Sequence, residues 1–119
     1  MDRIELGSDL EIELDVFSGR RNPRWALSGE RAVDIRERLR DLEPAERRDP
    51  PGLGYRGFLV HDRRLTLRVF DSLVTILVEG RSWRDTGGVE ELLITQAREH
   101  GYDDVLRAFR DKPRPSRTG

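Results

Sequence analysis

The sequence predicts a two-layer α+β domain in which a four-stranded, mostly antiparallel sheet carries helices packed on one face. Apolar residues alternate with charged ones in one early segment, as in a strand, and recur at spacings of three and four in three others, as in helices. Taken along the chain, the patterns predict the order β-α-β-β-β-α-α. A length of 119 residues suits one hydrophobic core, and we expect a single domain over residues 1–112.

The first half of the chain predicts one strand and one helix. In residues 10–17, leucine, isoleucine and valine alternate with acidic residues, which is typical of a strand with one buried face. Ser28 is a suitable N-cap for a helix over residues 29–42, whose apolar residues form one stripe. Prolines and glycines in residues 43–54 predict an irregular connection that crosses from this helix to the sheet.

The second half predicts three strands and then two helices. We expect strands at residues 55–61, 65–70 and 73–78 and helices at residues 89–100 and 104–110. Residues 73–78 are apolar on both faces, as in a central strand or in one that packs against a second subunit, so a homodimer is one assembly that the pattern fits. Residues 113–119 contain prolines, arginines and small polar residues, and we expect them to form a disordered tail.

The composition excludes several kinds of chemistry and partner. The chain has no cysteine, which excludes disulfides, thiolate nucleophiles, thiolate zinc sites and iron–sulfur clusters. A formal net charge of −1 provides no overall field that would attract nucleic acid or an anionic membrane. The N-terminus lacks a signal-peptide pattern, and no apolar run approaches the roughly 20 residues that span a bilayer. We therefore expect a cytoplasmic protein without a membrane partner, for which nucleic acid is disfavoured.

Metal and cofactor sites are not expected either. Glu11, Glu13 and Asp15 share one face of the first strand at a repeat that could converge on a hard cation, but carboxylates on an exposed strand are usually only solvated. No zinc, EF-hand or phosphate-loop spacing occurs in the sequence. The two histidines lie outside any catalytic motif: His61 ends a strand, and His100 precedes a glycine where a helix should end.

The loop at residues 18–25 is the segment richest in functional side chains. It combines three arginines, an asparagine and a tryptophan, which suit carboxylate or phosphate binding and the stacking of planar groups. The structural alternative is a turn at Asn22-Pro23, with Trp25 as a core anchor and Arg20 bridging to nearby acids. A second loop at residues 52–57 could extend a tyrosine and an arginine toward the same ligand. The candidate ligand-binding residues are Arg20, Arg24, Trp25, Tyr55 and Arg56.

Together the two loops resemble a pattern of small uncharacterised bacterial proteins. The pattern reads FSGRxNPxW from Phe17 to Trp25 and LGYRGF from Leu53 to Phe58, and it covers roughly the first half of the chain. No activity is attached to it, so the resemblance implies only that both loops belong to one recurring architecture, which favours their meeting in space. Arg21 stands where the pattern has proline, which argues against a rigid turn at that position.

Three functions remain open from the sequence. The first is a non-enzymatic binding or accessory domain that recognises an anionic small molecule or an acidic protein segment through the arginines and aromatic residues of the two loops. The second is a small metal-independent enzyme in which His61, Asp15 and Tyr55 perform acid–base chemistry. The third is a nucleic-acid-binding module in which Trp25 or Trp83 stacks on bases. The composition of the loops favours the first.

Overall fold

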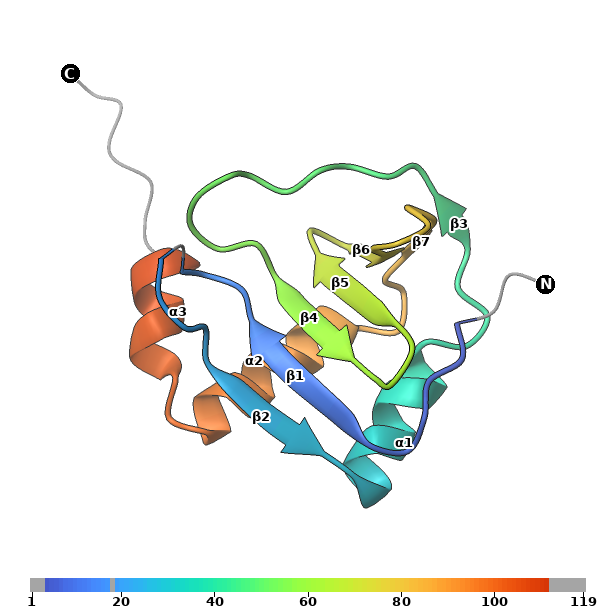
Figure 1. Ribbon diagram of the computed structural model, residues 1–119, viewed down its shortest axis with the longest axis horizontal. Helices are drawn as coiled ribbons and strands as arrows, with labels where there is room; N and C mark the ends of the chain where they lie inside the picture. Colours follow the sequence, from blue (N-terminus) through green and yellow to red (C-terminus); the bar gives the residue numbers. More distant parts are fainter. Residues whose placement is uncertain (1–3, 18, 112–119) are drawn as a thin grey trace.

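The chain folds around one antiparallel sheet of seven strands. The computed structural model describes residues 4–17 and 19–111, which include three helices (Figure 1). The strands are β1 (Leu10–Leu14), β2 (Arg24–Leu27), β3 (Pro44–Ala45), β4 (Phe58–His61), β5 (Thr66–Phe70), β6 (Leu73–Ile76) and β7 (Ser82–Arg84). The helices are α1 (Gly29–Arg38), α2 (Val89–Glu99) and α3 (Asp103–Phe109). The order across the sheet is β2-β1-β4-β5-β6-β7-β3, so β2 and β3 are its edges.

The helices cover one face of the sheet and enclose the core. In Figure 1, α2 crosses behind β1 and β4. The core contains side chains with no exposed surface, such as Ile12 and Phe58 from the sheet and Ile35 and Leu93 from the helices. Because successive side chains of a strand point to opposite faces, the acidic residues of β1 lie on the other face, which we call the outer face.

The predicted α+β class is confirmed, but the prediction of a four-stranded sheet is wrong. The three additional strands, β2, β3 and β7, lie in segments that the sequence presents as loops. They have only four, two and three residues, which is too short for alternation to be recognised. Pro44 is tolerated in β3 because that strand is at the edge of the sheet, where a missing N–H breaks no internal hydrogen bond.

The first helix is shorter than predicted. The sequence indicates residues 29–42, whereas α1 ends at Arg38 with Leu39 as its C-cap. Asp41 has a φ of 55°, a left-handed conformation that cannot continue a helix. Ser28 occupies the N-cap position, but its side chain makes no capping hydrogen bond.

The apolar segment at residues 73–78 is partly a central strand. Its first four residues form β6, which lies between β5 and β7, and this central position accounts for the apolar side chains of β6, whereas Leu77 and Val78 follow the strand and are exposed. The predicted tail, residues 113–119, lies outside the described residues. Within the part of the chain that the structure describes, no helix is long and apolar enough to cross a membrane.

Candidate functional site

The two loops that the sequence singles out lie side by side. Asp15 N donates a hydrogen bond to Gly57 O at 3.0 Å, and Arg56 N donates to Asp15 O at 2.9 Å. The Arg56 guanidinium also donates to Phe17 O at 3.0 Å and to Gly52 O at 2.5 Å. The two loops therefore meet at the end of β1, and Arg56 is the side chain that joins them.

The carboxylate of Asp15 lies at the centre of this junction. It accepts hydrogen bonds from the guanidinium of Arg56 at 2.9 Å and from that of Arg68 at 2.7 Å. Burial alone would raise the pKa of Asp15, but the hydrogen bonds and positive charges of the two arginines outweigh burial and hold this pKa below its usual value. Asp15 is therefore ionised, and both arginines are already paired with a charge of their own chain.

Asn22 fixes the first loop to the outer face of β1. Its Oδ1 accepts hydrogen bonds from the backbone N–H groups of Val16 at 3.1 Å and Phe17 at 2.8 Å. Its Nδ2 donates to Glu13 Oε2 at 2.7 Å and to Asp15 Oδ1 at 3.2 Å. The amide thus uses two donors and two acceptor positions within the chain, so Asn22 shapes the loop rather than offering itself to a ligand.

Glu13 is the second buried acid of the outer face. It pairs with Arg24 at 3.0 Å and with Nε2 of His61 at 2.9 Å, while Arg24 also binds Glu11 at 2.8 Å. Burial would raise the pKa of Glu13, but its hydrogen bonds and the nearby positive charge lower it below its usual value. The expectation of a solvated acidic face is wrong for Glu13 and Asp15, which are 8% and 7% exposed, because side chains of the neighbouring strands cover them.

Trp25 points away from these charges and into the core. The register of β2 places it opposite Ile12. Its Nε1 donates to Gln96 Oε1 at 3.1 Å, and its ring stacks with those of His100 and Tyr102 at centroid distances of 5.2 and 5.9 Å. Trp25 is therefore the core anchor of its loop, and its indole is not available to stack on a ligand.

We call the exposed residues of the two loops, together with the aromatic pair beside Arg20, the loop end. It comprises Phe17, Arg20, Arg21, Leu53 and Phe109, of which Phe17 is half-buried and the other four are exposed. The rings of Phe17 and Phe109 pack edge to face at 5.3 Å, and the guanidinium of Arg20 lies 3.9 Å from the centroid of Phe17. Leu53 is 77% exposed and Phe109 is 41% exposed. Within the described residues Arg20 has no carboxylate partner, so the loop end joins an unneutralised cation to an apolar surface.

A hollow of about 570 Å³ is lined by Tyr55 of the second loop and by residues of α2 and the end of α3, among them Glu90 and Arg110. The Tyr55 hydroxyl donates to Glu90 Oε2 at 2.5 Å, and the Arg110 guanidinium lies 5.7 Å from the Tyr55 ring centroid. Burial raises the pKa of Glu90, and the hydrogen bond from Tyr55 offsets this only in part. Burial and the charge of Glu90 also raise the pKa of Tyr55. The hollow thus contains a carboxyl group that accepts a proton more readily than usual.

The three acid–base candidates do not form one site. Asp15 is held by two arginines, whereas Nδ1 of His61 lies 3.1 Å from Thr66 Oγ1 and its other nitrogen contacts Glu13. Tyr55 borders the hollow and bonds to a helix residue. Their partners therefore give these residues separate environments, and the geometry assembles no shared acid–base centre.

Arg68, Glu90 and Arg110 are functional-type residues that the sequence analysis missed. The pattern of β5 places Arg68 on the outer face, because it alternates with buried Leu67 and Val69. No local spacing connects it with Asp15, which lies 53 residues away in the chain. Only the pairing of strands brings these charges together.

The remaining observations concern metals and known proteins. Among the described residues, no group of three or more histidines and acidic residues is placed to hold a metal ion. Comparison of the chain with protein-family models, with curated proteins and with solved structures found no match. The choice of a function therefore depends on the geometry of the chain itself.

Proposed function

We propose that this chain is a non-enzymatic binding domain that recognises an acidic segment of a protein partner through the loop end. The observation that carries the proposal is the position of Arg20, whose guanidinium is stacked on Phe17 at an exposed surface without a carboxylate of its own among the described residues. A stacked guanidinium is held in place by the ring while its N–H groups stay free to bind an anion.

The neighbouring residues favour a protein segment over a small anion. Phe109, which packs on Phe17 beside Arg20, is 41% exposed, and Leu53 of the second loop is a further exposed apolar side chain. Small-molecule sites are usually concave and enclose most of their ligand, whereas an exposed surface of this kind suits an extended segment that lies across it. The sequence also names Arg24 and Arg56 as candidate ligand-binding residues. Arg24 pairs with Glu13 and Arg56 pairs with Asp15, so both would hold the loops in place rather than contact the partner.

Fluorescence anisotropy with a labelled acidic hexapeptide that contains interspersed leucines tests this function. We expect Arg20→Glu to weaken binding by about tenfold or more, because a charge-assisted contact becomes a repulsive one. Arg40→Glu is the matched control, since Arg40 is an exposed arginine that follows α1. Equal affinity of the Arg20→Glu variant and the wild type would show that the loop end does not bind acidic segments.

A further inference from the structure

The edge strand β2 presents backbone groups that have no partner in the described chain. Leu14 N donates a hydrogen bond to Pro23 O at 2.9 Å across the β1–β2 pair. Because alternate residues of a strand bond toward the same side, Arg24 and Ala26 turn their N–H and C=O groups away from β1. Both residues are exposed, and no hydrogen bond within residues 4–17 and 19–111 uses these four groups. The outer edge of β2 is therefore open to a further strand.

The opposite edge of the sheet is better protected. β3 has only two residues, and one of them is Pro44, which lacks an N–H group. β2 contains no proline, and its one charged side chain is neutralised within the chain. Arg24 pairs with Glu11 at 2.8 Å and with Glu13 at 3.0 Å, so its charge does not prevent another strand from approaching.

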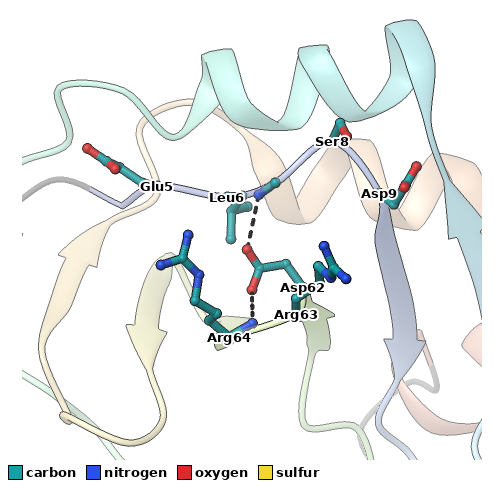
Figure 2. A pocket seen from close by; sticks show the side chains of 8 residues that line it. Glu5, Leu6, Ser8, Asp9, Asp62, Arg63 and Arg64 are labelled. Atoms are coloured by element: carbon teal, nitrogen blue, oxygen red, sulfur yellow. Dashed lines mark hydrogen bonds between the residues drawn. The ribbon is translucent and has the colours of Figure 1, made fainter.

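The described N-terminal segment does not cover β2 either. Gly7 N donates to Asp62 Oδ2 at 3.0 Å, and Gly7 O accepts from Arg36 at 3.1 Å. Figure 2 shows the segment from Glu5 to Asp9 passing over the side chain of Asp62, which lies in the turn between β4 and β5. Because β4 and β2 flank β1 on opposite sides, the segment is fastened away from the open edge.

We propose that β2 pairs in antiparallel fashion with β2 of a second copy of this chain, which gives a two-fold symmetric dimer with one continuous sheet. With the two-fold axis at Trp25, Arg24 of each copy lies opposite Ala26 of the other. Each of these two residue pairs is a hydrogen-bonded pair, because both members turn their backbone groups outward. The open groups of both copies are then all satisfied.

The charges of the outer face make this edge complementary to itself. The register of the β1–β2 pair places Glu11 beside Ala26. Arg24 of the second copy, opposite Ala26, would lie in the same row, with its Cα two strand spacings or roughly 10 Å from that of Glu11. The small side chain of Ala26 leaves room for an arginine to reach across it, and Glu11 and Arg24 are 48% and 47% exposed. Each copy thus offers an arginine to an acid of the other.

Other occupants and registers fit the edge less well. An axis at Arg24 would place the two Arg24 side chains directly opposite each other, which is destabilising. An axis at Ala26 would place Arg24 opposite Ser28, where β2 has ended, so fewer bonds would form. A strand rich in acids would bring more negative charge beside Glu11. The dimer edge is also separate from the loop end, so this proposal and the proposed function can fail independently.

Hydrogen exchange of the wild-type chain tests the pairing without any substitution. Amide exchange is followed by NMR between about 50 μM and 1 mM, a range suited to a small interface, while sedimentation equilibrium gives the dimer fraction. We expect the amides of Arg24 and Ala26 to exchange about fivefold or more slowly where the dimer predominates, because their N–H groups become bonded. The amide of Trp25, which faces β1, should exchange at the same rate throughout.

Ala26→Pro is the substitution that blocks the edge. It removes only an outward N–H group, and proline is tolerated on an edge strand, so the fold should be retained. The dissociation constant of the dimer should rise about tenfold or more, whereas Ala26→Ser keeps the N–H group and should dimerise like the wild type. The proposal is overturned if the wild type stays monomeric at the highest concentration, if its dimer leaves the amides of Arg24 and Ala26 unprotected, or if Ala26→Pro dimerises like Ala26→Ser.

Discussion

Asp15 is the residue on which the two loops converge. It is ionised and nearly buried, and two guanidiniums neutralise it at 2.9 and 2.7 Å. Removing one member of such a group leaves the other charges without compensation, and this usually costs more than the intact pair contributes. The stability of the loop junction should therefore depend strongly on this one carboxylate.

We expect Asp15→Asn to lower the free energy of unfolding by about 2 kcal/mol, because Arg56 and Arg68 would keep little solvent contact and lose their counter-charge. Asp34→Asn removes a carboxylate from an exposed pair with Arg38 and should cost about 0.5 kcal/mol or less. Urea denaturation measures both values. Equal costs would mean that the Asp15 cluster is no more than a surface ion pair.

The same carboxylate should make the protein sensitive to acid. The pKa of Asp15 and that of Glu13 are lowered in the folded chain, so the unfolded chain binds protons first as the pH falls. Both groups stabilise the fold above their unfolded pKa values of about 4, and this contribution is lost as the pH falls below that range. Unfolding measured between about pH 6 and pH 2 should show a shallower loss of stability in Asp15→Asn than in the wild type, and identical slopes would contradict this.

At this scale the sequence predicted residue types better than their roles. The composition of their loops makes Arg24 and Arg56 candidate ligand-binding residues, but both form ion pairs with acids of the same chain. The structural alternative for Trp25 holds, because the indole is fixed in the core by Gln96. Neither outcome can be derived from local spacing, since the partner of Arg56 lies 41 residues away and that of Trp25 lies 71 residues away.

Among the elements, β4 begins at a close approach of backbones. Gly57 has a φ of 83°, and a Cβ at this position would lie 2.2 Å from Val69 O and 2.6 Å from Phe70 Cβ. Residue 57 also accepts the hydrogen bond from Asp15 N that joins the loops. A glycine is therefore required where β1, β4 and β5 come together.

Gly57→Ala should cost at least about 3 kcal/mol, because it combines an unfavourable φ with a clash against the backbone of β5. Gly54 is the matched control, since its φ is 85° and a Cβ there meets nothing within 4 Å. Gly54→Ala should cost only about 1 kcal/mol, which is the penalty for the backbone conformation alone. Thermal unfolding distinguishes the two, and similar melting temperatures would contradict the close approach.

The long elements were predictable and the short ones were not. The helix α2, at Val89–Glu99, falls almost where its apolar stripe places it, because eleven residues suffice to show a helical period. The strands β2 and β7 are held mainly by their neighbours: β2 pairs with β1, and β7 pairs with β6. Apart from Trp25 and Trp83, their residues carry little intrinsic preference for a strand, so their existence depends on tertiary pairing.

Across the whole molecule, the proposed interaction surface depends on residues that are far apart in the chain. The loop end combines Phe17, Arg20, Arg21, Leu53 and Phe109. Its two loops stand out in the sequence because they share one pattern. The contribution of Phe109 could not be predicted, since Phe109 meets Phe17 only through the fold.

The central claim, that the loop end is an interaction surface, is tested most directly by mapping where the acidic hexapeptide binds. Amide chemical shifts of the full chain are followed by NMR while the hexapeptide is added. We predict saturable shifts that cluster at Phe17, Arg20, Arg21, Leu53 and Phe109 and disappear in Arg20→Glu. The absence of saturable shifts at these residues, or shifts confined to other parts of the chain, would contradict the claim.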